Sequence, residues 1–138
     1  MELSRKMKEK GFTLIELMVV MAVIGILAGL TLTGFTAARK TARDGQRKAD
    51  LEQVRSALEM CRSDTGSYPA GTLVSGNNIT CGGATYMQIP NDPGGFRYYY
   101  TRTGASSYRL CAHLETGGGS TGCGSNCSGT CNYEVNQP

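Results

Sequence analysis

The sequence is poor in the residues that build enzyme active sites. It has one histidine, His113, in 138 residues, and it shows no paired acids and no nucleophile beside a base. Its glycine runs, at 82–83, 94–95 and 117–119, do not open a helix after a strand, so none is predicted to bind phosphate. We therefore expect no enzyme activity and no cofactor, and we expect His113 to lie on the surface without an acid–base partner.

Charge is also scarce in one long segment. No charged side chain occurs between Leu17 and Ala38, and a helix of this length spans about 33 Å, enough to cross a bilayer. Most of the net charge of +3 lies in residues 1–11, which predicts a cytoplasmic N-terminus. The remainder is nearly neutral, so a nucleic-acid surface is not indicated, although it stays possible.

Glu16 stands at the head of this apolar segment, in the stretch GFTLIELMVV (11–20). An ion inside lipid costs about 2.5–3.5 kcal/mol on insertion scales, so the carboxylate needs compensation or a use. A secretory signal peptide does not fit, because the apolar run is too long and no A-x-A site closes it. A plain membrane anchor leaves Glu16 unexplained, unless the side chain reaches to the interface.

Cysteine is absent from the first 60 residues, and six cysteines follow. An even number confined to the polar part predicts disulfides formed outside the cytoplasm. Cys123, Cys127 and Cys131 could instead ligate a metal, but structural zinc needs a fourth ligand and a reducing setting. Six cysteines allow 15 pairings, of which we favour Cys61 with Cys81. The six candidates are Cys61, Cys81, Cys111, Cys123, Cys127 and Cys131.

A short basic leader, the motif KGFTLIE and some twenty apolar residues together resemble the N-terminus of type IV prepilins and type II secretion pseudopilins. The resemblance implies that a prepilin peptidase cuts between Gly11 and Phe12 and methylates the new amine of Phe12. It also implies that Glu16 of one subunit pairs with the Phe12 amine of a neighbour. A pair inside one helix is an alternative, because the two groups lie one turn apart. Buried opposite charges cost far less together than apart, and such a pair fixes register.

The expected fold class is α+β. A long helix over residues 12–63 is half apolar and half amphipathic, with Leu51, Val54 and Leu58 on its apolar face. We expect Asp44 to pair with Lys48, and Asp50 with Arg47, along a solvated face. Gly66 is predicted to stop the helix.

A small antiparallel sheet is expected to pack on this helix. Its strands are predicted at 96–102, 108–115 and 131–135, with Tyr108, Leu110, Ala112 and Leu114 toward the helix. The stretches SDTGSYP and PNDPGGF are similar to the same family. The expected domains are a leader (1–11), a transmembrane or filament-core helix (12–38) and a globular head (39–138).

The resemblance implies a structural subunit of a type IV pilus-like filament. Alternatives are a pseudopilin of a secretion or DNA-uptake machine, a minor pilin that binds DNA or a surface, and a membrane protein that never polymerises. The implied partners are further copies of the chain, the prepilin peptidase, and an inner-membrane platform with its ATPase. We expect one pass through the cytoplasmic membrane, and then a periplasmic or extracellular filament.

Some secretion pseudopilins bind calcium in an acidic C-terminal loop. After Asp92 this chain has only Glu115 and Glu134 as acids, whereas calcium takes six to eight oxygen ligands. We therefore predict that no metal is bound and that disulfides hold this region.

Overall fold

The computed structural model describes residues 11–137, with only the backbone described at 31–33. The predicted leader thus lies outside the described residues, apart from Gly11. The chain divides into two compact units, Met1–Ala37 and Ala38–Pro138. The second unit is the head.

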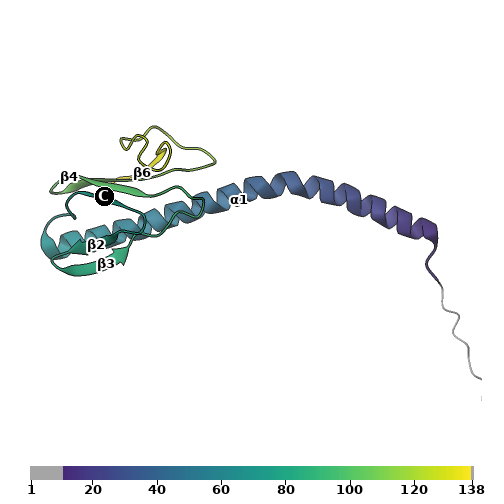
Figure 1. The fold of residues 1–138 in the computed structure, drawn as a ribbon, viewed down its shortest axis with the longest axis horizontal. Helices are drawn as coiled ribbons and strands as arrows, with labels where there is room; N and C mark the ends of the chain where they lie inside the picture. The colour runs from purple at the N-terminus through teal and green to yellow at the C-terminus, as the bar shows by residue number, and fades with distance from the viewer. Residues whose placement is uncertain (1–10, 138) are drawn as a thin grey trace, which may run out of the picture. The chain divides into compact units, whose positions relative to one another are not determined.

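One helix, α1, runs through both units from Leu14 to Thr65 (Figure 1). It begins two residues later than predicted, because Thr13 forms its N-terminal cap: the Thr13 hydroxyl accepts a hydrogen bond from the Glu16 amide at 3.3 Å. It ends at Gly66, whose φ of 77° is left-handed and whose amide donates to the Arg62 carbonyl at 2.7 Å. Within the described chain, α1 is the one helix long and apolar enough to cross a membrane.

The head contains two antiparallel sheets. Four strands form the larger sheet in the order β1-β4-β5-β6, and β2 and β3 form a separate hairpin. The strands are β1 (Thr72–Val74), β2 (Asn78–Cys81), β3 (Ala84–Gln88), β4 (Tyr99–Gly104), β5 (Ser107–Ala112) and β6 (Tyr133–Val135). These elements confirm the α+β class, although β1, β2 and β3 were not predicted.

The core of the head lies between α1 and the larger sheet. Tyr100, Leu110 and Val135 stand opposite one another on β4, β5 and β6, and all three are buried together with Leu51, Val54 and Leu58 of α1. Tyr108, Leu110 and Ala112 belong to the same core, which confirms their predicted facing toward the helix, whereas Leu114 is buried but is not part of this core. Because this core lies wholly within the head, we expect the head to fold by itself.

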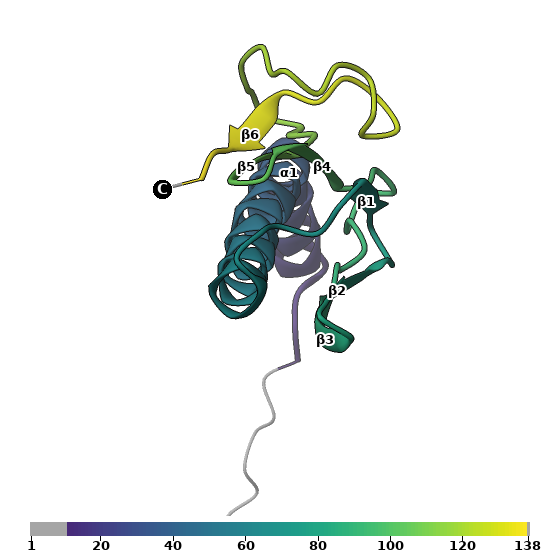
Figure 2. The same ribbon diagram turned by 90° about the vertical axis from the view of Figure 1, so that its left-hand side faces the viewer.

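A C-terminal lobe, residues 115–132, covers the face of the larger sheet that points away from α1 (Figure 2). It contains a second cluster made of Cys111, Cys123, Cys127 and Cys131, with Tyr99 packed against it. Arg97 and Arg109 bind the lobe by donating to the carbonyls of Asn126 and Gly122. The outward face of β5 is thus partly covered, rather than open to solvent.

Candidate assembly site at the head of the apolar helix

Glu16 and Thr13 form a reciprocal cap at the start of α1. The Glu16 carboxylate accepts from the Thr13 amide at 2.8 Å and from the Thr13 hydroxyl at 2.9 Å, while the hydroxyl accepts from the Glu16 amide. This is the capping box expected of a Thr-x-x-Glu sequence. The sequence TLIE carries the signal for this cap, a role of Glu16 that its charge alone does not indicate.

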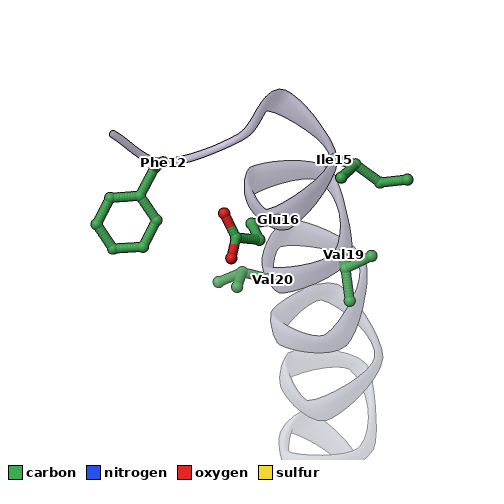
Figure 3. Close-up of a pocket in the computed structure, with 5 residues that line it drawn as sticks. All are labelled: Phe12, Ile15, Glu16, Val19 and Val20. Carbon is green, nitrogen blue, oxygen red and sulfur yellow. The ribbon is translucent and has the colours of Figure 1, made fainter. Parts of the chain in front are cut away.

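Phe12 lies beside the same carboxylate. Its side chain lines a shallow notch on the helix surface together with Glu16 and Val20, while Ile15 and Val19 form the adjoining edge (Figure 3). Both Thr13 hydrogen bonds reach Oε2 of Glu16. In the described part of the chain no hydrogen bond reaches Oε1, so this oxygen can accept a further donor.

The first unit presents its apolar side chains on all sides. Phe12 is 88% exposed, and large exposed residues continue along the helix as far as Phe35. A helix that is apolar all round needs lipid or other helices around it. The group consists of Phe12, Leu14, Ile15, Leu17, Met18, Val19, Val20, Met21, Val23, Ile24, Ile26, Leu27, Leu30 and Phe35.

A buried ion cluster fastens the C-terminal lobe to α1. Arg47, fully buried, donates to Asp92 at 2.6 and 2.9 Å, to Asp44 at 2.7 Å and to Glu115 at 2.9 Å. Arg43 donates to Glu115 through two hydrogen bonds of 2.7 and 2.6 Å. Two guanidinium groups thus hold three carboxylates from three separate parts of the chain.

The carboxylates of this cluster are held ionised. Burial opposes ionisation of Asp44, but hydrogen bonds from Thr116, from the Glu115 amide and from Arg47 outweigh it and lower the pKa to about 2. The hydrogen bond from Arg43 lowers the pKa of Glu115 to about 2, with Arg47 adding to it against the effect of burial. Hydrogen bonds and ion pairs within the structure keep these groups ionised against the effect of burial.

The predicted ion pairs on the solvent-exposed side of the helix are wrong. Asp44 pairs with Arg47, three residues away, and not with Lys48. Asp50 is buried and accepts a hydrogen bond from the Tyr98 hydroxyl at 2.6 Å, and not from Arg47. The spacing of charges along the helix predicted pairs between neighbouring side chains on the surface. Tertiary contacts with residues far along the chain determine the actual partners of these two carboxylates.

His113 is also placed differently from the prediction. It is half-buried, its ring stacks on Phe96 with centroids 4.0 Å apart, and its Nδ1 lies 2.7 Å from the Thr130 carbonyl. The residue therefore packs against the C-terminal lobe, instead of standing alone on the surface.

The six cysteines form three disulfides. The structure joins Cys61 to Cys81, the pair favoured above, and it joins Cys111 to Cys123 and Cys127 to Cys131. No thiol is left free, so the alternative of a cysteine-ligated metal is wrong for this structure. Within residues 11–137, no group of three or more histidine, cysteine or acidic side chains is arranged to hold a metal ion.

Comparison with known proteins gives two family matches that adjoin along the chain. The model described as "Prokaryotic N-terminal methylation motif" matches residues 6–32. The model for type II secretion system protein G matches residues 35–122, which is more than half of the chain.

Individual relatives agree with these matches. The chain is 30% identical to type II secretion system core protein G of Escherichia coli, over 70% of this chain and 74% of that protein. It is 29% identical to the protein of that name from Vibrio cholerae, over 83% and 88%. It is 46% identical to the type IV wide pilus major component of Thermus thermophilus, over 43% and 45%. No solved structure matches.

Proposed function

The chain belongs to the family of type II secretion system protein G, and from this premise we propose that it is the repeating subunit of a pseudopilus. Prepilin peptidase processing follows from the N-terminal methylation motif. The class predicted from the sequence, a pilin-like structural subunit, is confirmed. Within that class, the protein G match favours the pseudopilin alternative over the type IV pilus subunit that the sequence analysis put first.

One observation carries the proposal: a single ionised side chain, that of Glu16, lies at the start of a helix segment whose apolar residues are exposed on every side. A membrane would cover those residues before assembly, and neighbouring helices would cover them in the filament. Burial contributes about 25 cal/mol for each Å² of apolar surface in either case. Apolar burial alone does not specify axial register, and the Glu16 charge supplies that specificity.

The proposed sequence of events follows from the chemistry of Phe12. In the precursor its nitrogen is an amide bonded to Gly11, and Thr13 donates to Oε2 of Glu16. Hydrolysis of the Gly11–Phe12 bond consumes a water molecule and leaves a carboxylate on Gly11 and an amine on Phe12. Transfer of a methyl group from a methylsulfonium donor, which leaves as a thioether, gives a secondary amine that is protonated and so stays cationic. A neighbouring subunit then offers Glu16 to this amine, and the two charges enter the filament core together rather than alone.

Disruption of the gene in its native host tests the proposal. We expect loss of secreted proteins from the medium, with the same proteins retained in the periplasm, and recovery on expression of the wild-type chain. Overexpression should give short filaments that contain this chain, visible by immunogold electron microscopy. Normal secretion in the disrupted strain would contradict a pseudopilus role.

The resemblance to the Thermus wide-pilus component supports a second candidate, a subunit of a long type IV pilus. That match is higher in identity but covers under half of either chain. Loss of long surface fibres in the disrupted strain, with secretion intact, would assign the chain to this second function.

A further inference from the structure

The head contains a short sequence pattern that its fold and the proposed function leave unused. The tripeptide Asn-x-Ser/Thr, with any residue except proline in the middle, is the acceptor sequence for N-linked glycans. It occurs at Asn78, as Asn-Ile-Thr, and again at Asn126, as Asn-Cys-Ser. Both copies lie in the head, but the fold surrounds the two asparagines differently.

The first copy is exposed at both residues that define it. It lies in β2, where Asn78 and Thr80 are exposed while Ile79 and Cys81 are buried. The buried side of this strand is tied to α1 by the disulfide between Cys81 and Cys61. Within the part of the chain that the structure describes, no hydrogen bond involves the side-chain amide of Asn78. The amide nitrogen is therefore open to a reactant that approaches from solvent.

The second copy is closed by the fold of the C-terminal lobe. The side-chain amide of Asn126 donates a hydrogen bond to the Cys123 carbonyl at 2.7 Å. The middle residue of the tripeptide, Cys127, is fully buried and is bonded to Cys131. The amide nitrogen of Asn126 is thus already engaged, and the disulfide holds the tripeptide in place. Of the two asparagines, Asn78 is the one that the folded head offers for modification.

We propose that Asn78 is the acceptor of an N-linked glycan, added to the head on the outer side of the cytoplasmic membrane. The donor is a glycan carried on a polyprenyl diphosphate, and a membrane-bound oligosaccharyltransferase catalyses the step. Nδ2 of Asn78 attacks the anomeric carbon of the glycan, so that a C–N bond forms while the C–O bond to the diphosphate breaks. Polyprenyl diphosphate leaves with the electron pair of that bond, and the amide nitrogen gives one proton to a base of the transferase. This inference rests on the membrane-held state in the proposed function, with the head outside the cytoplasm.

The position of Asn78 determines what a glycan there would affect. Figures 1 and 2 show the hairpin of β2 and β3 away from the C-terminal lobe, so a glycan on β2 leaves the lobe undisturbed. Because glycans are bulky and solubilising, the face of β2 that carries one would stay outside the contacts between copies in a filament. Glycosylation of Asn78 thus also predicts that this face of the head is turned toward solvent after assembly.

Mass spectrometry of the full chain from membranes of its native host tests the proposal. The mature chain should be heavier than its methylated sequence, and fragmentation of the peptides should locate the added sugars on Asn78. Asn78→Gln and Thr80→Ala should each lose the added mass, whereas Thr80→Ser keeps the hydroxyl and should keep the glycan. Asn126→Gln, the matched control, should leave the glycan unchanged. These variants should fold, because Thr80→Ala removes only an exposed contact of 3.3 Å with the Thr85 hydroxyl.

Protease treatment of spheroplasts separates failure of this inference from failure of the proposed function. A head that is digested from outside, yet yields an Asn78 peptide without sugar, would overturn glycosylation and leave the membrane-held state intact. Sugars located on Asn126, or on a serine or threonine, with Asn78 bare, would likewise overturn the inference. A head that is protected from the protease until the membrane is lysed would overturn the membrane-held state, and this inference with it.

Discussion

The Arg47 guanidinium donates a hydrogen bond to each carboxylate oxygen of Asp92, at 2.6 and 2.9 Å, although the two residues are 45 positions apart. Such a two-point contact fixes orientation as well as distance. Both side chains are fully buried. The contact joins α1 to the loop before β4, and through Glu115 it also joins the C-terminal lobe.

Arg47→Ala should therefore destabilise the head strongly. It leaves Asp92 and Asp44 buried without their cation, which costs about 3–5 kcal/mol. Urea unfolding of a chain that begins at Ala38 measures the change. Arg55→Ala removes an exposed pair with Glu52, 3.4 Å apart, and should cost no more than about 1 kcal/mol. Equal losses in the two variants would show that burial of the cluster contributes little.

Acid should weaken the same cluster over a defined range. Asp44 and Glu115 have pKa values lowered to about 2 from ordinary values of 3.8 and 4.5. The unfolded chain therefore binds protons first, and the stabilisation, complete above about pH 5, is lost as pH falls toward 2. Urea midpoints between pH 7 and pH 2.5 measure this loss. Asp44→Asn should be less stable at pH 7 and should show a shallower decline, and an unchanged slope would contradict the assignment.

The sequence predicted the parts of the fold that local periodicity controls. Leu51, Val54 and Leu58 recur at helical spacing, and Gly66 ends the helix as its freedom to adopt a positive φ allows. The residues of the assembly site could also be identified from the sequence, since they lie in the contiguous motif KGFTLIE. These signals lie within a few residues of one another, so no tertiary information was needed.

The ion cluster around Arg47 could not be predicted from local sequence patterns. Arg47 resembles any solvated helix arginine until Asp92 and Glu115, 45 and 68 residues away, fold against it. The hairpin of β2 and β3 did leave a signal, because Gly82-Gly83 separates two short runs that contain Ile79 and Tyr86. The sequence-based prediction treated this glycine pair as unsuited to phosphate binding, and it placed no strands on either side.

Gly11→Leu should block processing of the precursor. The structure leaves open space around Gly11, so the larger side chain does not disturb the chain itself, and the expected defect lies in the peptidase pocket. Mass spectrometry and N-terminal sequencing of membranes should find the intact leader. Gly11→Ala, a smaller change, should still be cut. Recovery of a free Phe12 N-terminus from Gly11→Leu would refute the prediction.

Glu16→Ala should separate anchoring from assembly. The helix becomes more apolar, so cleavage and membrane insertion should be normal. The Phe12 amine would lack its partner in the filament, and loss of one member of a buried pair costs about 3–5 kcal/mol. We expect few or no filaments by electron microscopy.

Glu16→Gln distinguishes the charge from the helix cap. Its side-chain carbonyl can still accept from the Thr13 amide and hydroxyl, which Glu16 does at 2.8 and 2.9 Å, so the cap is kept while the charge is lost. Filaments should again be scarce. Abundant filaments from Glu16→Gln would mean that the cap, and not the ion pair, is what assembly needs.

Disulfides, and not a bound cation, should hold the C-terminal lobe. The carboxylates in or beside it are already bonded within the chain, because Asp44 and Glu115 bind arginine and Glu134 accepts from the Gly122 amide. Few oxygen ligands are thus left for calcium. Closing a loop of ~15 residues stabilises a protein by about 3 kcal/mol in the chain-entropy model. The Cys111–Cys123 link spans 12 residues and Cys127–Cys131 spans 4, so the first should contribute more.

Thermal unfolding of the head with reductant, and separately with chelator, measures the two contributions. We expect a large fall in melting temperature with reductant and no change with chelator. Cys111→Ala/Cys123→Ala should lower the melting temperature more than Cys127→Ala/Cys131→Ala, since the longer link removes more conformational entropy from the unfolded chain. Non-reducing peptide mapping should recover the three pairs intact. A melting temperature that falls with chelator alone would mean that a cation, rather than the Cys111–Cys123 link, fastens the lobe to the sheet.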